Sequence, residues 1–291
     1  MMVTAELVKQ LRERTGAGMM ECKKALVAAN GDADAAAEQL RVQGLAKADK
    51  KSSRVAAEGM LVIERSGLGA VMVEVNCETD FVAKQDDFQN FARAVARKAL
   101  ESRVTDVVAL MSQPGTGGEA LEVIRKNLVA KIGENIAVRR VAALTAPTAL
   151  GAYLHGTRIG CLVALKGGSE GLARDLAMHA SAMNPEYVTA ANVPAEILEK
   201  ERAIFAEQVK GEQKPAEIIA KMVEGKLRKR LAEITLYGQP FVKDDKLTVE
   251  KLLKSAGAEV TGLVRYEVGQ GIEKKQGDFV AEVMATVKGA H

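Results

Sequence analysis

The apolar residues of this chain change their spacing near Gly59, and this change limits the folds that the chain can adopt. Before Gly59 they recur every three or four residues, as on one face of a helix. After it, Val71, Val73 and Val75 alternate with a second set of residues that includes Glu74, as in a β-strand. The sequence therefore predicts an α+β protein with a helical module ahead of its first strands.

The first part of the chain, residues 1–46, is predicted to form a small three-helix domain. Thr4 is a suitable N-cap for the first helix, and glycines interrupt the apolar pattern between the helices. Asp32 or Asp34 would cap the third helix, which is expected to reach about Gln43. The first two helices are expected at 4–14 and 19–30.

A polar, basic stretch without periodicity follows, and residues 47–58 are interpreted as a linker. Its charged part, 47–54, fits a solvated connector. A strip that binds phosphate is the alternative, although no aromatic residues are interleaved there to stack on bases.

Residues 59–145 are predicted to form a first core subdomain, with an antiparallel hairpin, helices and a returning strand. The same order recurs in a second subdomain, formed by residues 146–193 and 236–264. This recurrence resembles an internal duplication in the order of elements, not in residue identity. Strands are expected at 60–64, 70–77, 136–144, 153–155, 159–165 and 259–268, and helices at 86–101, 119–132, 170–183 and between Thr248 and Gly257.

Residues 194–235 interrupt the second subdomain and are predicted to form a protruding helical hairpin. Its two antiparallel helices are expected at 195–211 and 215–235. The hairpin could serve partner contact or self-association through its apolar seams, or simply pack on the core. The C-terminal module, 265–291, is predicted to contain a helix because its apolar residues have helical spacing.

Composition argues against several classes of protein. The 291 residues are 47% apolar and 27% charged, which is ordinary for a soluble protein, and the net charge of +3 is weak support for binding nucleic acid. The three cysteines are far apart, which fits a reduced, cytoplasmic environment. We expect no signal peptide and no membrane partner, because no apolar run approaches the ~18 residues of a membrane span.

The chain contains no recognisable catalytic motif, so we expect no enzyme, no catalytic residue, no metal site and no cofactor. The three histidines lie in no metal-binding motif. The glycine-rich stretches 114–118 and 167–171 lack the lysine and the serine or threonine of a phosphate-binding loop. The basic segment 226–230 is interpreted as a solvated helix face.

The segment Thr79-Asp80-Phe81-Val82 is the strongest candidate for a functional site. It follows a predicted strand and places a carboxylate beside a large aromatic ring in an expected exposed turn. An exposed Phe81 would favour docking to another protein. Alternatively, Thr79 or Asp80 caps the turn while Phe81 folds back into the core.

A second candidate group consists of Arg12, Met19 and Met20. Two adjacent methionines at the start of a helix are not easily both buried, and methionine suits adaptable protein contacts. One buried and one incidental methionine is the alternative.

Several long stretches of sequence together resemble the bacterial translation elongation factor Ts family, over nearly the whole chain. These stretches are Leu11–Met20, Cys22–Leu26, Glu74–Lys84, Lys131–Asn135, His155–Gly160, Gly238–Val242 and Arg265–Gly269. Their length and their order make chance similarity implausible.

The resemblance implies guanine nucleotide exchange on the GTPase elongation factor Tu. It also implies that the N-terminal domain is ubiquitin-associated-like and docks through Arg12, Met19 and Met20. Asp80 and Phe81, within the segment from Thr79 to Val82, would act as a wedge near the partner's magnesium and phosphate site.

Three further residues, Ile132, Gly133 and His155, would also face that partner according to the resemblance.

The competing class is an RNA-binding or ribosome-associated protein, suggested by the basic segments 47–54 and 226–230. Tight RNA binding with a steep dependence on salt would identify it.

Overall fold

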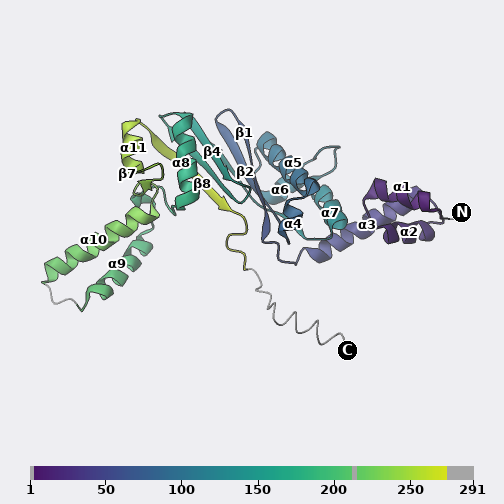
Figure 1. Ribbon diagram of the computed structural model, residues 1–291, viewed down its shortest axis with the longest axis horizontal. Coiled ribbons are helices and arrows are strands. Elements are labelled where there is room, and N and C mark those ends of the chain that lie inside the picture. Colours follow the sequence, from purple (N-terminus) through teal and green to yellow (C-terminus); the bar gives the residue numbers. More distant parts are fainter. Residues whose placement is uncertain (1–2, 212–214, 274–291) are drawn as a thin grey trace.

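The computed structural model describes residues 3–211 and 215–273. This part of the chain is elongated, with three N-terminal helices at one end, a pair of helices at the other, and two β-sheets between them (Figure 1). Helices and small antiparallel sheets occur together, which confirms the α+β class.

The N-terminal helices form a bundle with its own core. They are α1 (Ala5–Thr15), α2 (Met19–Ala28) and α3 (Ala33–Lys51). The hydroxyl of Thr4 accepts a hydrogen bond from the N–H of Leu7 and so caps α1, whereas Gly16 ends it in the left-handed region at φ 68°. Leu11 and Leu26 are buried between the helices.

Helix α3 does not end near Gln43, as the sequence predicted, but continues well beyond it. Gly44 does not break the helix because it lies against α7 (Leu121–Ile132), where an added Cβ would be only 3.0 Å from the Cβ of Ala130. Ala48 is fully buried in the neighbouring core. The first part of the predicted linker is therefore helical, because tertiary packing outweighs the local preference of glycine.

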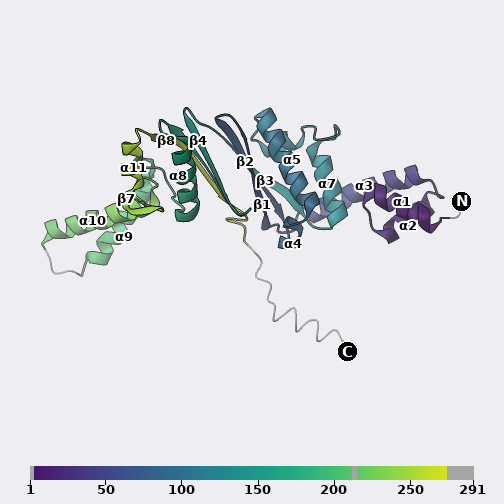
Figure 2. The same ribbon diagram turned by 45° about the horizontal axis from the view of Figure 1, so that its top comes forward.

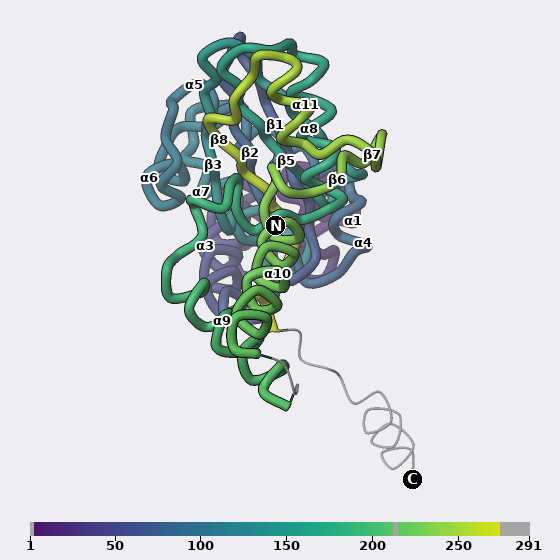
Figure 3. Tube along the Cα trace, turned by 90° about the vertical axis from the view of Figure 1, so that its left-hand side faces the viewer, coloured from purple at the N-terminus to yellow at the C-terminus, as the bar shows by residue number. Residues whose placement is uncertain are grey.

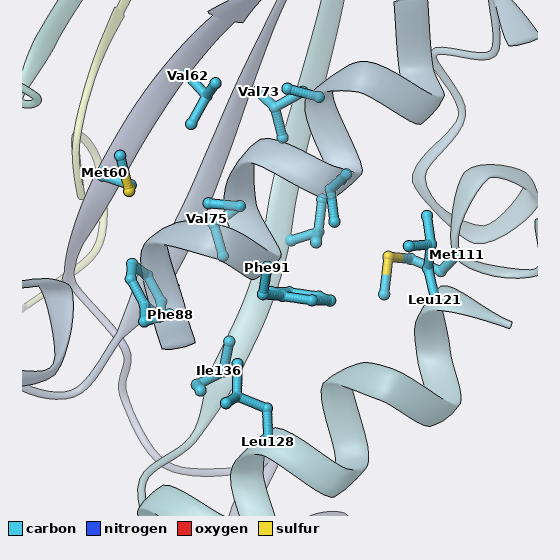
Figure 4. Packing of buried hydrophobic residues seen from close by; sticks show 14 of the residues in the cluster. Met60, Val62, Val73, Val75, Phe88, Phe91, Met111, Leu121, Leu128 and Ile136 are labelled. Atoms are coloured by element: carbon cyan, nitrogen blue, oxygen red, sulfur yellow. The ribbon is translucent and has the colours of Figure 1, made fainter. Parts of the chain in front are cut away.

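The first sheet has the order β1-β2-β3 and is antiparallel throughout. Its strands are β1 (Glu58–Ser66), β2 (Gly69–Cys77) and β3 (Ile136–Thr145). Helices α5 (Asp86–Ser102), α6 (Val107–Met111) and α7 pack against it. Figure 4 shows Phe88 and Phe91 of α5 between the strands and the side chain of Leu128. The apolar face of α5 thus provides much of this core.

The second sheet repeats this plan in the order β4-β5-β8. Its strands are β4 (Ala149–His155), β5 (Ile159–Lys166) and β8 (Glu259–Glu267). The same subdomain contains two helices, α8 (Glu170–Met183) and α11 (Val249–Ser255), and two short strands, β6 (Pro240–Phe241) and β7 (Asp244–Thr248). Gly151 lets α8 approach β4 closely, because an added Cβ would lie 2.0 Å from the carbonyl oxygen of Ala173. In both sheets, a hairpin supplies two strands and a later strand pairs with the second of them.

The two sheets pack against each other through a separate apolar cluster that includes Leu61, Met72, Leu150 and Leu162. Strand β2 is therefore buried on both faces, with helices on one side and the second sheet on the other. Figure 2 shows the two sheets side by side between their helices.

The predicted helical hairpin is formed by α9 (Ala195–Val209) and α10 (Ala216–Ile234), preceded by a 3₁₀ turn (Ala190–Asn192). Figure 3 shows it extending away from the sheets. Within the basic segment of α10, Lys226 donates to Gln208 at 3.0 Å and Arg230 donates to Glu201 at 3.4 Å. These two cations thus bind α9 across the hairpin.

The helix predicted in the C-terminal module depends on apolar residues from Phe279 to Val287. These positions lie outside the described residues.

Candidate functional site

Thr79 begins a single helical turn, α4 (Asp80–Ala83), directly after β2. Its hydroxyl oxygen accepts a hydrogen bond from the N–H of Val82 at 3.4 Å, which satisfies a free backbone donor at the start of the turn. Thr79 also donates twice to Glu134, from its N–H at 3.0 Å and from its hydroxyl at 2.7 Å. The predicted exposed turn is therefore helical and is anchored to a residue far along the chain.

The residues that follow Thr79 differ sharply in burial. Phe81 is 76% exposed, whereas Val82 is 4% exposed and belongs to the core of the first sheet. Thr79 caps the turn, as one alternative held, but Phe81 does not fold back into the core because Val82 occupies that place. The phenyl ring thus presents apolar surface whose burial by a partner would yield about 1.5–3 kcal/mol.

Asp80 carries the negative charge of this turn. Lys84 lies 2.7 Å from its carboxylate, and the hydrogen bond from Lys84 lowers the pKa of Asp80 below its ordinary value of 3.8. The ammonium of Lys84 also lies 5.9 Å from the centre of the Phe81 ring. A carboxylate, a cation and an aromatic ring therefore share one exposed helical turn.

The end of α7 lies beside this turn. Gly133 ends the helix at φ 91°, and its carbonyl oxygen accepts a hydrogen bond from the ammonium of Lys51 at 2.6 Å. Ile132 is half-buried against the core of the first sheet. Glu134 directly follows Gly133 and binds Thr79. The structure therefore brings the predicted site residues Ile132 and Gly133 close to the segment that begins at Thr79 (Figure 1).

The N-terminal candidates are all exposed. Arg12 lies on the surface of α1, and Met19 and Met20 are 55% and 64% exposed at the start of α2. The alternative with one buried methionine is therefore wrong. The loop between these helices approaches the end of α7, because an added Cβ at Gly16 would lie 3.2 Å from the side chain of Lys131.

His155 is exposed at the end of β4, with its Nδ1 atom 3.5 Å from the hydroxyl of Tyr153. The turn after it is tied to β1, because the N–H of Leu61 donates to the carbonyl of Thr157 at 2.8 Å. Strand β1 in turn pairs with the end of β2, which leads into α4. His155 thus lies toward the same end of the sheets as the Thr79 turn, but on the second sheet.

Glu134 was not among the residues selected from the sequence. It lies next to the predicted Ile132 and Gly133, and its carboxylate anchors Thr79. The sequence signal that could have identified Glu134 is its position directly after Gly133, the glycine that ends a predicted helix. The sequence alone does not show that its partner is Thr79.

The chemistry of the region is that of surface contacts. Cys77, just before the turn, is buried, which raises its pKa to about 12, and its thiol donates to the carbonyl of Thr79 at 3.1 Å. Within residues 3–211 and 215–273, no three His, Cys, Asp or Glu side chains gather as a metal site would require. None of the helices in that part has the length and apolar character needed to cross a bilayer.

Comparison with known proteins identifies the class of this chain. The family model described as Elongation factor TS matches residues 78–270, which contain α4, Glu134 and both sheets apart from β1 and β2. The chain is thus a translation elongation factor, a component of protein biosynthesis.

Three relatives, each named Elongation factor Ts, align with almost the whole chain. The protein of Alkalilimnicola ehrlichii is 57% identical over 100% of both chains, that of Thioalkalivibrio sulfidiphilus is 56% identical over 100% of both, and that of Francisella tularensis subsp. novicida is 53% identical over 99% of both. The chain belongs to the elongation factor Ts family.

Proposed function

We propose that this protein is a guanine nucleotide exchange factor that binds elongation factor Tu and promotes release of its GDP. The observation that carries the proposal is the Phe81 ring, 76% exposed on a turn whose neighbours Thr79 and Val82 are anchored to the protein. Membership in the elongation factor Ts family supports it, because the sequence resemblance implies exchange on that GTPase.

Phe81 and Asp80 act as a wedge near the magnesium and phosphate site of the partner. Bound GDP is held there by phosphate contacts and by a hard magnesium ion that demands near-octahedral oxygen ligands. The phenyl ring fills an apolar gap only when the partner's magnesium-side elements have moved, and Asp80 disturbs the polar surroundings of the ion. The energy of insertion is therefore gained in the state that holds GDP weakly.

This coupling is reciprocal. If the factor weakens GDP binding by a given ratio, GDP weakens binding of the factor by the same ratio. A coupling free energy of about 3 kcal/mol corresponds to a ratio of about 150. Exchange of this kind requires differential binding and no bond-making chemistry, so we propose that the protein is not an enzyme.

The remaining candidates provide the rest of the docking surface. The N-terminal bundle is a ubiquitin-associated-like domain that binds the GTPase domain through Arg12, Met19 and Met20. Ile132 and Gly133 contact the partner beside the wedge, and His155 contacts it from the second sheet.

Other parts of the molecule have separate roles in this proposal. The two sheet subdomains are products of an internal duplication, which their matching strand order supports. The helical hairpin serves self-association or partner contact, supported by Ile204 and Ile218, which are 43% and 46% exposed. The protein acts in the cytoplasm, where its partner and the ribosome are.

Replacement of Phe81 by alanine tests the wedge. We expect Phe81→Ala to keep the fold and to lower the maximal rate of GDP release by about 10- to 150-fold, the equivalent of about 1.5–3 kcal/mol. The release is measured by stopped flow, with a fluorescent GDP analogue on elongation factor Tu and increasing concentrations of the factor.

Val108→Ala is the matched control, because Val108 is 80% exposed on α6, away from the turn. An unchanged maximal rate in Phe81→Ala would eliminate the wedge. A pulldown of elongation factor Tu should also lose yield when GDP is in excess, and equal yields would contradict reciprocal coupling.

A further inference from the structure

Two carboxylates hold the wedge turn and the end of α7 together through reciprocal hydrogen bonds. Glu134 accepts from the N–H of Thr79 at 3.0 Å, and Glu78 accepts from the N–H of Asn135 at 2.6 Å. Glu134 thus binds the backbone of Thr79, which follows Glu78. In turn, Glu78 binds the backbone of Asn135, which follows Glu134. Bonds from an N–H to an ionised carboxylate are about twice as strong as neutral ones.

The same junction also binds the end of α3. The amide of Asn135, which is 5% exposed, donates to the carbonyl of Arg54 at 2.8 Å, and the guanidinium of Arg54 lies 3.5 Å from Glu78. Lys51, the last residue of α3, donates to the carbonyl of Gly133 at 2.6 Å. Since α3 is a helix of the N-terminal bundle, this junction connects that bundle to the wedge turn and to the end of α7.

The hydroxyl of Thr79 links the junction to the wedge. Its proton is donated to Glu134 at 2.7 Å, which leaves its oxygen free to accept from the N–H of Val82 at 3.4 Å. Glu134 thus sets the orientation in which the hydroxyl caps α4. The cap fixes the backbone of the turn and thereby the direction of the Phe81 side chain.

We propose that Glu78 and Glu134 are positioning residues for nucleotide exchange, which pre-organise Phe81 before the partner is bound. This inference rests on the proposed function, in that Phe81 is the group positioned. Without the two glutamates, the turn must be ordered during docking, and the entropy lost then reduces the energy available for insertion. The glutamates themselves need not touch the partner.

The first test uses the protein without any partner. The chain contains no tryptophan, so Phe81→Trp introduces a single indole fluorophore at the wedge. Time-resolved anisotropy should show a small amplitude of local nanosecond motion in this variant, and Glu134→Ala added to it should increase that amplitude. Glu101→Ala is the matched control, because Glu101 is exposed on α5 and pairs with Lys98 of the same helix. Equal amplitudes in all three would overturn the proposal.

Thr79 provides a second variant that does not depend on Glu134. Thr79→Val in the Phe81→Trp background removes the hydroxyl and should increase the motion, whereas Thr79→Ser restores the hydroxyl and should restore the small amplitude. If the serine and valine variants show the same motion, the hydroxyl link is wrong.

The second test measures GDP release from elongation factor Tu. Glu134→Ala should slow the maximal rate by about 2- to 10-fold, the cost of ordering one or two side chains during docking. In a Phe81→Ala background it should cause no further loss, because it acts through the ring. Equal slowing in both backgrounds would overturn positioning. If Phe81→Ala has no effect on GDP release while the anisotropy differs as expected, the proposed wedge function is wrong. The finding that Glu134 orders the turn would then still hold.

Discussion

The carboxylate of Glu74 accepts a hydrogen bond from the N–H of Gly269 at 2.8 Å, although 195 residues separate them. Glu74 is completely buried in β2, and it also binds Arg139 at 3.1 Å and Arg140 at 2.5 Å. The guanidinium of Arg140 in turn lies 3.8 Å from the centre of the Tyr266 ring. A buried carboxylate in the first sheet thus holds the chain where it leaves the last strand of the second.

Removal of this charge should destabilise the protein. Glu74→Gln keeps the shape of the side chain but leaves two arginines without their carboxylate, and breaking a buried ion pair from one side costs about 3 kcal/mol. Urea unfolding followed by circular dichroism should show the loss. Glu101→Gln is the control, because Glu101 is exposed and pairs with Lys98 of the same helix at the surface. Equal midpoints for the two variants would contradict this account.

The contribution of Glu74 should also depend on pH. Burial raises the pKa of Glu74, but the N–H of Gly269, Arg140 and Asn76 together hold it below the ordinary value of 4.5. The unfolded chain therefore takes up the proton first as the pH falls. The stabilisation is complete above pH 4.5 and disappears as the pH falls through the folded-state pKa.

The measurement is the difference in unfolding free energy between the unchanged protein and Glu74→Gln at several pH values. It should stay constant from about pH 7 to about pH 5 and shrink at lower pH. A difference that is constant down to about pH 3 would show that ionisation of Glu74 does not contribute.

Elements with strong local patterns were predictable from the sequence. Helix α8 was expected at 170–183 and spans Glu170–Met183, because Ser169 caps it and its apolar residues recur at helical spacing. The end of α3 was not predictable from the sequence, because Gly44 packs against Ala130 of α7, a helix far along the chain. The turns α4 and α6 were too short to show a period.

In the candidate site, too, some residues could be predicted from local sequence patterns and others could not. The exposed residues Phe81, Met19 and Met20 were selected because large apolar side chains stood at positions that the local pattern placed on the surface. The anchor Glu134 was missed because its bond to Thr79 spans 55 residues, and a carboxylate carries no periodic signal of its partner. Local pattern thus predicts what is exposed, whereas non-local bonds decide how firmly it is held.

His179 should take up its proton at a lower pH in the folded protein than in the unfolded chain. Burial lowers its pKa below 6.5, against the opposing effect of Gln239, and its Nδ1 atom accepts from the N–H of Val242 at 3.1 Å. Because the unfolded chain binds the proton first, stability should fall as the pH drops below 6.5. Titration of the ring by NMR should give a pKa below that value. In His179→Gln the decline in stability between about pH 6.5 and pH 5 should be smaller; an equal decline would contradict the assignment.

Asp80→Ala should slow GDP release from elongation factor Tu in the same direction as Phe81→Ala, without lowering the melting temperature. Asp80 is exposed, so its loss removes little from the folded state but removes the charge proposed to disturb the partner's magnesium site. Stopped-flow release measures the effect, with Asp86→Ala as a control on the next exposed carboxylate. Lys84→Ala frees Asp80 from its ion pair, and if it slowed release as much as Asp80→Ala, the ion pair rather than the charge would be the cause.

The methionines of the N-terminal bundle should determine affinity rather than the maximal rate of exchange. Met19 and Met20 are exposed and lie on α2, away from the wedge turn. The double change Met19→Ala/Met20→Ala should weaken binding to elongation factor Tu by about tenfold or more, since burial of one such side chain yields about 1.5–3 kcal/mol. Titration calorimetry gives the affinity, and stopped flow at saturating factor should give an unchanged release rate. Val27→Ala on the same helix, 58% exposed, is the matched control. A lower maximal rate with unchanged affinity would assign the methionines to the wedge instead.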